Sequence, residues 1–125
     1  MSGDCAVAAD GRLAAYDFGP DRPFQAGRLE AGLSLLRAAK VLEDGDLLAF
    51  GPAGDADLEL IHDRDYLEAL ARFSAAGAAP DDPVEATRFG LVGDNRPFPG
   101  RDQAARLVTG ATMAALDAVA GGDLA

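Results

Sequence analysis

Apolar side chains recur at helical spacing in two long stretches of the chain. Small apolar residues form one stripe over residues 102–120, and Gly121 and Gly122 follow it as a helix-terminating pair. Leucines at helical spacing form a second stripe over residues 28–40, where Lys40 suits the negative pole of a helix dipole. The pattern therefore predicts two long helices.

Shorter helices are predicted where an aspartate precedes an apolar repeat. Asp55 and Asp63 both occupy such positions, and aspartate is a favoured helix N-cap. Residues 74–84 are rich in alanine, glycine and proline, and this composition predicts a surface loop. The repeat after Asp63 consists of Tyr66, Leu70 and Phe73.

Two short apolar runs predict buried strands. One covers residues 5–9 and leads into a turn at Asp10 and Gly11, and the other covers residues 47–50. Strands that alternate with helices favour an α/β fold with a parallel sheet. Because two strands cannot form a sheet with both faces covered, we expect the sheet to be incomplete within this chain.

Length and charge narrow the class of protein. A chain of 125 residues suits a single domain, residues 1–125, and no apolar run reaches the roughly 18 residues needed to cross a membrane. The net charge of −10 argues against nucleic acid or an anionic membrane as a partner. Cys5 is the single cysteine, which suits a reducing compartment, and no signal peptide precedes it. We therefore expect a cytoplasmic protein.

No self-sufficient catalytic set can be assembled from the residues themselves. A hydrolytic zinc site needs about three protein ligands. The single histidine, His62, has Asp63 next to it, and neighbouring residues point to different faces of a helix. Ser34 and Ser74 have no histidine partner in their sequence context. The sequence therefore predicts no catalytic residue, no metal ligand and no cofactor site in this chain.

Three segments, in each of which polar residues lead into a predicted helix, nevertheless stand out. They are YDFGPDRPFQAGRLEAGLSLLRAA, ELIHDRDYLEAL and GDNRPFPGRDQAARLVTGATMAALDAV. In this order they resemble the N-terminal part of the zinc-dependent histone deacetylase and acetoin-utilisation deacetylase family. The resemblance implies a three-layer α/β/α, arginase-like fold with a mostly parallel sheet, of which residues 1–125 would form an incomplete N-terminal portion.

The resemblance also implies roles for particular residues. Asp94 matches the acid at the rim of the acyl-lysine tunnel, which accepts hydrogen bonds from the substrate backbone. Arg28 and Tyr16 match residues that line an inner cavity behind the zinc, although Arg28 equally suits a structural role at a helix start. Arg22 stands where the family usually has histidine, and a permanently charged guanidinium cannot replace a neutral imidazole.

An intact member of that family is expected to bind zinc and to hydrolyse acetyl-lysine-type amides. The family's zinc ligands and tandem histidines have no counterpart in these 125 residues. We therefore expect this chain to supply the rim and inner walls of a site, without zinc and without activity of its own. The alternative is a non-catalytic binding or regulatory module, whose sheet would be completed by self-association or by a partner.

Overall fold

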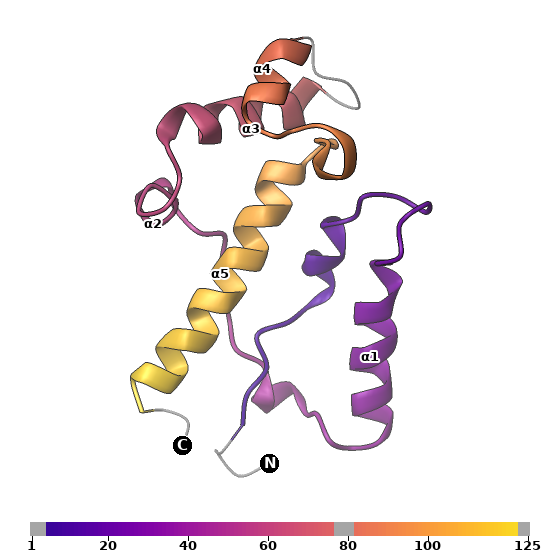
Figure 1. The fold of residues 1–125 in the computed structure, drawn as a ribbon. Helices are drawn as coiled ribbons and strands as arrows, with labels where there is room; N and C mark the ends of the chain where they lie inside the picture. The colour runs from indigo at the N-terminus through magenta and orange to yellow at the C-terminus, as the bar shows by residue number, and fades with distance from the viewer. Residues whose placement is uncertain (1–4, 77–81, 123–125) are drawn as a thin grey trace.

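The computed structural model describes residues 5–76 and 82–122, which form helices joined by long loops. Helix α5 runs through the middle of the molecule, α3 and α4 lie at its N-terminal end, and η1 lies between α5 and α1 (Figure 1). Within the described residues, no helix is both long enough and apolar enough to cross a membrane. The elements are η1 (Gly11–Ala15), α1 (Gly27–Ala38), η2 (Asp44–Asp46), α2 (Asp55–Leu58), α3 (Arg64–Ala76), α4 (Pro83–Arg88), η3 (Gly93–Asn95) and α5 (Arg101–Ala120).

Helix α5 confirms the longest predicted stripe to within one residue. It ends as predicted, because the Gly121 N–H donates to the Asp117 carbonyl at 2.7 Å and Gly122 adopts a left-handed φ of +78°. Small side chains on its buried face let neighbouring segments approach closely. The buried small residues are Ala104, Gly110, Ala111 and Ala118.

Helix α1 confirms the second predicted stripe, but it ends at Ala38. Lys40 follows with a left-handed φ of +56°. The Val41 N–H donates to the Leu36 carbonyl and the Lys40 N–H to the Arg37 carbonyl, both at 3.0 Å. This is the Schellman arrangement, in which glycine usually takes the left-handed position. Lysine therefore terminates the helix in a conformation that strains its backbone.

The hydrophobic core lies where α3 packs against α4 and the segment that follows it. The predicted repeat after Asp63 is confirmed as helix α3, and it buries Leu70 and Phe73 against Ala86 and Leu91. Phe73, Ala86 and Leu91 are all 0% exposed. Burying a side chain as large as that of Phe73 or Leu91 contributes about 1.5–3 kcal/mol.

The predicted loop over residues 74–84 is wrong at both ends. Helix α3 continues to Ala76, and α4 begins at Pro83; residues 77–81 lie outside the described residues. The Asp82 carboxylate accepts the Glu85 N–H at 2.9 Å, so an aspartate cap followed by proline in the first turn starts a helix. The composition of residues 74–84 is that of a loop, and for that reason the helix start at Asp82 and Pro83 was not predicted.

The two predicted strands come together in parallel but make only one bridge. Val7 pairs with Leu47, the Val7 N–H donates to the Asp46 carbonyl at 2.8 Å, and the Leu48 N–H donates to the Val7 carbonyl at 2.9 Å. The described residues form no longer strand. Two short runs without further neighbours cannot build a stable sheet. The predicted sheet is therefore absent from the described residues, and the three-layer fold stays a prediction.

The short helix α2 starts one residue earlier than predicted. Gly54 is the N-cap and Asp55 is the first helical residue, so Asp55 does not cap the helix. The carboxylate of Asp57 instead accepts the Gly54 N–H at 3.1 Å. Asp55 is thereby free to face α5, where it forms an ion pair with Arg106.

Candidate functional site

Two polar loops from distant parts of the sequence meet beside the start of α5. The first loop comprises residues 16–26 and the second loop comprises residues 91–100. The Nη1 atom of Arg22 in the first loop donates to Oδ1 of Asp94 in the second loop, and the two residues form an ion pair. Figure 1 shows both loops at this end of the molecule. Two residues that the sequence singled out separately are thus in direct contact.

A cluster of three aromatic rings also joins the same two loops. The ring centroids of Phe18 and Phe98 lie 5.1 Å apart, and those of Tyr16 and Phe98 lie 5.9 Å apart. Tyr16 and Phe18 lie 5.5 Å apart in an edge-to-face geometry. Such pairs contribute about 0.5–1.5 kcal/mol beyond the area they bury. The cluster therefore fixes one loop against the other.

Asp94 lies in η3 with its side chain 95% exposed. Gly93 before it has a φ of +58°, a conformation that glycine adopts without strain. The hydrogen bond from Arg22, and secondly the positive charge of Arg22, lower the pKa of the Asp94 carboxyl below its usual value. Oδ2 of Asp94 accepts no hydrogen bond from the described residues. The carboxylate is therefore ionised and exposed. It is also half engaged, because only one of its two oxygens accepts a hydrogen bond from the described residues.

Arg101 fixes the second loop from beneath. Its side chain projects from the first turn of α5 and the residue is only 5% exposed. Nη1 donates to the Asn95 backbone carbonyl and Nη2 donates to the Asn95 side-chain oxygen. The Asn95 amide in turn donates to the Gly90 carbonyl at 2.9 Å. The guanidinium carbon also lies 5.2 Å from the centroid of the Phe18 ring, so Arg101 contacts both loops.

The role of Arg101 was not predicted from the sequence. No carboxylate among the described residues pairs with it, and its Nε is buried without a hydrogen-bond partner. Burying a guanidinium without an acidic partner costs folding free energy unless its hydrogen bonds compensate for the lost contact with water. A signal was present in the sequence, because a cation in the first turn of a helix opposes the helix dipole and calls for another explanation.

Ser74 ties the end of α3 to the start of α5. Its Oγ accepts the Asp102 N–H at 3.1 Å and its carbonyl accepts the Gly100 N–H at 3.2 Å. Gly100 has a left-handed φ of +79° at this junction. Ser74 is 4% exposed, so both bonds are shielded from water. The residue therefore has a structural role at this junction.

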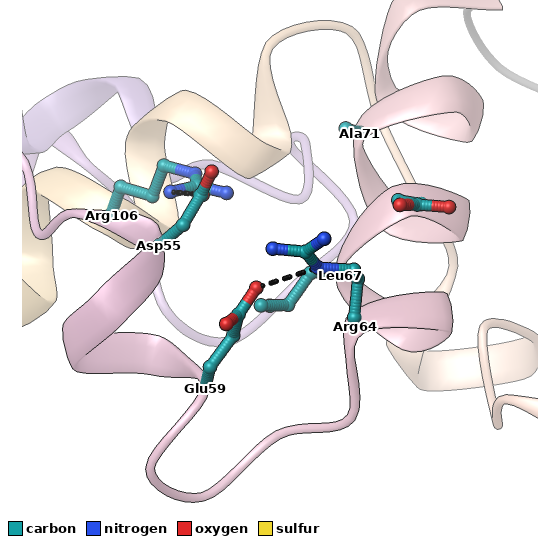
Figure 2. Close-up of a pocket in the computed structure, with 7 residues that line it drawn as sticks. Asp55, Glu59, Arg64, Leu67, Ala71 and Arg106 are labelled. Carbon is teal, nitrogen blue, oxygen red and sulfur yellow. Dashed lines mark hydrogen bonds and ion pairs between the residues drawn. The ribbon is translucent and has the colours of Figure 1, made fainter.

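A charged cleft of about 380 Å³ lies between α2, α3 and α5. Figure 2 shows Asp55 beside Arg106, and Glu59 facing Arg64. The Asp55–Arg106 pair measures 2.8 Å and the Glu59–Arg64 pair measures 2.9 Å. Burial lowers the pKa of Arg106, but hydrogen bonds to Asp55 and Asp102 outweigh it and raise that pKa overall. The two arginines that line the cleft are therefore both paired with acidic side chains that line it as well.

The described residues do not fit a zinc ion. Over residues 5–76 and 82–122, no group of three or more His, Cys, Asp and Glu side chains is arranged to hold a metal. His62 is exposed, and its ring lies 5.2 Å from the ring of Tyr66. Cys5 is exposed as well. No catalytic step through a metal can be derived for this part of the chain.

Two cavities adjoin the paired loops. A hollow of about 310 Å³ lies between them, and Tyr16 lines a second cavity of about 130 Å³ between α3 and α5. Arg28 lines neither: it is exposed at the start of α1, with its guanidinium carbon 5.7 Å from the Phe24 ring centroid. The inner-cavity roles of Tyr16 and Arg28 stay predictions. The hollow is lined by Asp17, Phe18, Gly19, Arg96, Pro97, Phe98 and Pro99.

Comparison with known proteins assigns the chain to a class. The family described as the histone deacetylase domain matches residues 22–125, so the chain belongs to the histone deacetylase family, and the predicted resemblance is confirmed. The whole second loop falls inside the match, as do residues 22–26 of the first loop.

One curated relative gives the scale of the match. The chain is 32% identical over 108 residues to the acetoin utilization protein AcuC of Bacillus subtilis (strain 168). The alignment covers 86% of this chain and 27% of AcuC, so the chain spans about a quarter of the length of this relative. No solved structure gives a significant match.

Proposed function

We propose that this chain forms the substrate rim and part of the inner wall of a zinc-dependent deacetylase site for acetyl-lysine-type amides. The observation that carries the proposal is the Asp94 carboxylate, held ionised and half engaged on a loop that Arg101 clamps, in a member of the histone deacetylase family. An ionised acceptor binds amide N–H groups more strongly than a neutral one. Asp94 would therefore hold the backbone of the substrate.

The chemistry itself would come from polypeptide outside these 125 residues. An intact family member is expected to use zinc to polarise the acyl carbonyl and activate water. The described residues form no group of three or more side chains that could hold a metal, and the role proposed for this chain is to bind and orient the substrate. We also propose a cytoplasmic location, which the single, exposed Cys5 supports.

An exposed apolar groove supports an association with such a catalytic portion. The groove has a volume of about 530 Å³ and lies between the segment after α2 and the C-terminal half of α5. Leu60 is 84% exposed, Ile61 is 87% exposed and Leu116 is 64% exposed. Contiguous exposed apolar surface marks an interaction site. The Val7–Leu47 bridge also leaves backbone edges to which further strands of a three-layer α/β/α fold could pair.

A chimaera tests the proposal. Residues 1–125 replace the matched N-terminal region of AcuC, and hydrolysis of an acetyl-lysine peptide is measured with and without a chelator. We expect chelator-sensitive hydrolysis by the chimaera and none by the 125-residue chain alone. Asp94→Asn in the chimaera should raise KM, whereas Asp44→Asn, an exposed acid on the distant η2, should not.

Two results would contradict the proposal. One is chelator-sensitive deacetylation by the purified chain alone. The other is a folded chimaera without activity, while AcuC handled in the same way is active. Cooperative melting of the chain alone, together with an inactive chimaera, would favour the non-catalytic binding module instead.

A further inference from the structure

We propose that Arg22 is a second substrate-binding residue of the rim, whose guanidinium donates to a backbone carbonyl of the peptide that Asp94 holds by its N–H groups. This inference rests on the proposed function and extends it to a residue that departs from the usual family pattern. The rim would then present a hydrogen-bond donor, Arg22, beside the acceptor Asp94, and not an acceptor alone.

The free hydrogen-bonding capacity of the ion pair carries the inference. Arg22 uses only Nη1 on Asp94, and Asp94 uses only Oδ1. The other guanidinium N–H groups of Arg22 and the Oδ2 atom of Asp94 make no hydrogen bond with the described residues. A guanidinium has five N–H donors in a fixed plane. The pair therefore presents unused donors directly beside an unused anionic acceptor.

This arrangement complements an extended peptide. Every non-proline residue of a peptide offers one N–H donor and one carbonyl acceptor. Successive peptide units present these groups within a few ångströms of each other along an extended chain. A carboxylate alone satisfies only the N–H groups, whereas the Arg22–Asp94 pair satisfies both kinds. A neutral imidazole at position 22 would offer a single donor.

Both side chains are held in place yet accessible. Arg22 is anchored through its backbone, because its N–H donates to the Gly19 carbonyl at 3.3 Å and its carbonyl accepts from the Gln25 side chain. The side chain of Arg22 is 26% exposed and that of Asp94 is 95% exposed. A pair that is positioned before binding loses less conformational freedom when the ligand arrives. The geometry thus suits recognition more than it suits simple neutralisation of charge.

The hollow between the two loops gives the ligand a place to rest. Its volume is about 310 Å³, and residues from the same two loops that carry the ion pair line it. Phe18 and Phe98 supply apolar surface, while Asp17 and Arg96 supply one charge of each sign. A peptide side chain next to the acyl-lysine could occupy this hollow while its backbone contacts Arg22 and Asp94.

Nuclear magnetic resonance of the isotope-labelled 125-residue chain tests the inference. The probe is a blocked tetrapeptide that contains one acetyl-lysine. We expect the Arg22 Nε–H and the Asp94 amide resonances to shift with one common Kd. Arg22→Ala should raise that Kd by about ten- to a hundredfold, as expected for the loss of one charge-assisted hydrogen bond. Arg22→Gln, which keeps a neutral donor, should have a smaller effect.

The control is Arg64→Ala, which removes an exposed arginine from the Glu59 ion pair on another face and should leave the Kd unchanged. Amide spectra of each variant report whether it is folded. If Asp94→Asn weakens binding while Arg22→Ala leaves it unchanged or tightens it, Arg22 is not a ligand-binding residue and the proposed function still stands. If the peptide shifts neither residue at millimolar concentration, both the Arg22 inference and rim binding by this chain are wrong.

Discussion

A Cβ atom on Gly110 would lie 1.8 Å from the carbonyl oxygen of Gly51. The chain crosses α5 at this point with backbone against backbone, and the Ala53 N–H donates to the Arg106 carbonyl at 2.9 Å. Ala53 is 5% exposed, so the crossing is buried. The crossing segment connects the Val7–Leu47 bridge to α2, and residues of α2 line both the charged cleft and the apolar groove.

Gly110→Ala should destabilise the protein strongly, because a rigid backbone leaves no room for the added methyl group. We expect a loss of about 3 kcal/mol or more, at the upper end of overpacking costs. Denaturant unfolding measures it. Gly32→Ala is the matched control: nothing lies within 4 Å of its Cβ position in the exposed face of α1, and it should gain about 0.5–1 kcal/mol. Equal effects at both sites would contradict the close approach.

Ser74→Ala should cost about 1–2 kcal/mol, because it leaves the buried Asp102 N–H without its acceptor. Thermal unfolding of the variant measures the loss. Ser34→Ala on the exposed face of α1 should change stability by less than about 0.5 kcal/mol. A Ser74→Ala variant as stable as the Ser34→Ala variant would show that water replaces the hydroxyl.

Lys40→Gly should stabilise the protein by about 0.5–1 kcal/mol. Glycine removes the cost of the left-handed conformation, and the greater freedom of glycine in the unfolded chain offsets part of the gain. Lys40→Ala keeps the strain and should be nearly neutral. Denaturant midpoints of the two variants separate backbone strain from loss of the lysine charge, and equal midpoints would contradict this assignment.

The Asp94 carboxyl should titrate below the usual aspartate range, because Arg22 donates to its ionised form. Since the folded-state pKa is depressed, the ion pair favours the folded state at pH values above the ordinary aspartate pKa of about 3.9. That contribution is lost as the pH falls through the depressed value. Carbon-13 titration of the carboxyl measures it.

Arg22→Gln should move the Asp94 midpoint up toward the ordinary value. The Asp10 carboxyl, whose pKa is lowered by a hydrogen bond from Arg12, serves as the internal reference and should not respond. An unchanged Asp94 midpoint in the variant would mean that Arg22 and Asp94 do not pair in solution.

Most of the helices were predictable because apolar repeats and capping residues in the local sequence mark them. The stripe over residues 102–120 and the repeat after Asp63 both became helices with nearly the predicted bounds. Helix α4 escaped because Asp82 and Pro83 sit in a stretch that looks like a loop by composition. The runs at residues 5–9 and 47–50 have strand-like sequences, but strand formation depends on neighbours that local sequence cannot supply.

The candidate site was predictable only in part. The glycines and prolines around Asp94 marked a rigid loop, and the family resemblance gave that acid a role. Its contact with Arg22 joins residues 72 positions apart, which no local pattern could reveal. Arg101 depends on two loops at once, through Asn95 and Phe18, so its importance appears only after the chain has folded.

The double attachment of Arg101 has a consequence for engineering this family. Because one guanidinium holds Asn95 in the second loop and covers Phe18 in the first, neither loop is an independent module. Transplanting the second loop alone into a relative would leave Asp94 and Phe98 without their partners Arg22 and Phe18. Residues 16–26 and 91–101 therefore have to be exchanged together, as one cassette, if the two loops are to keep their contacts in a relative.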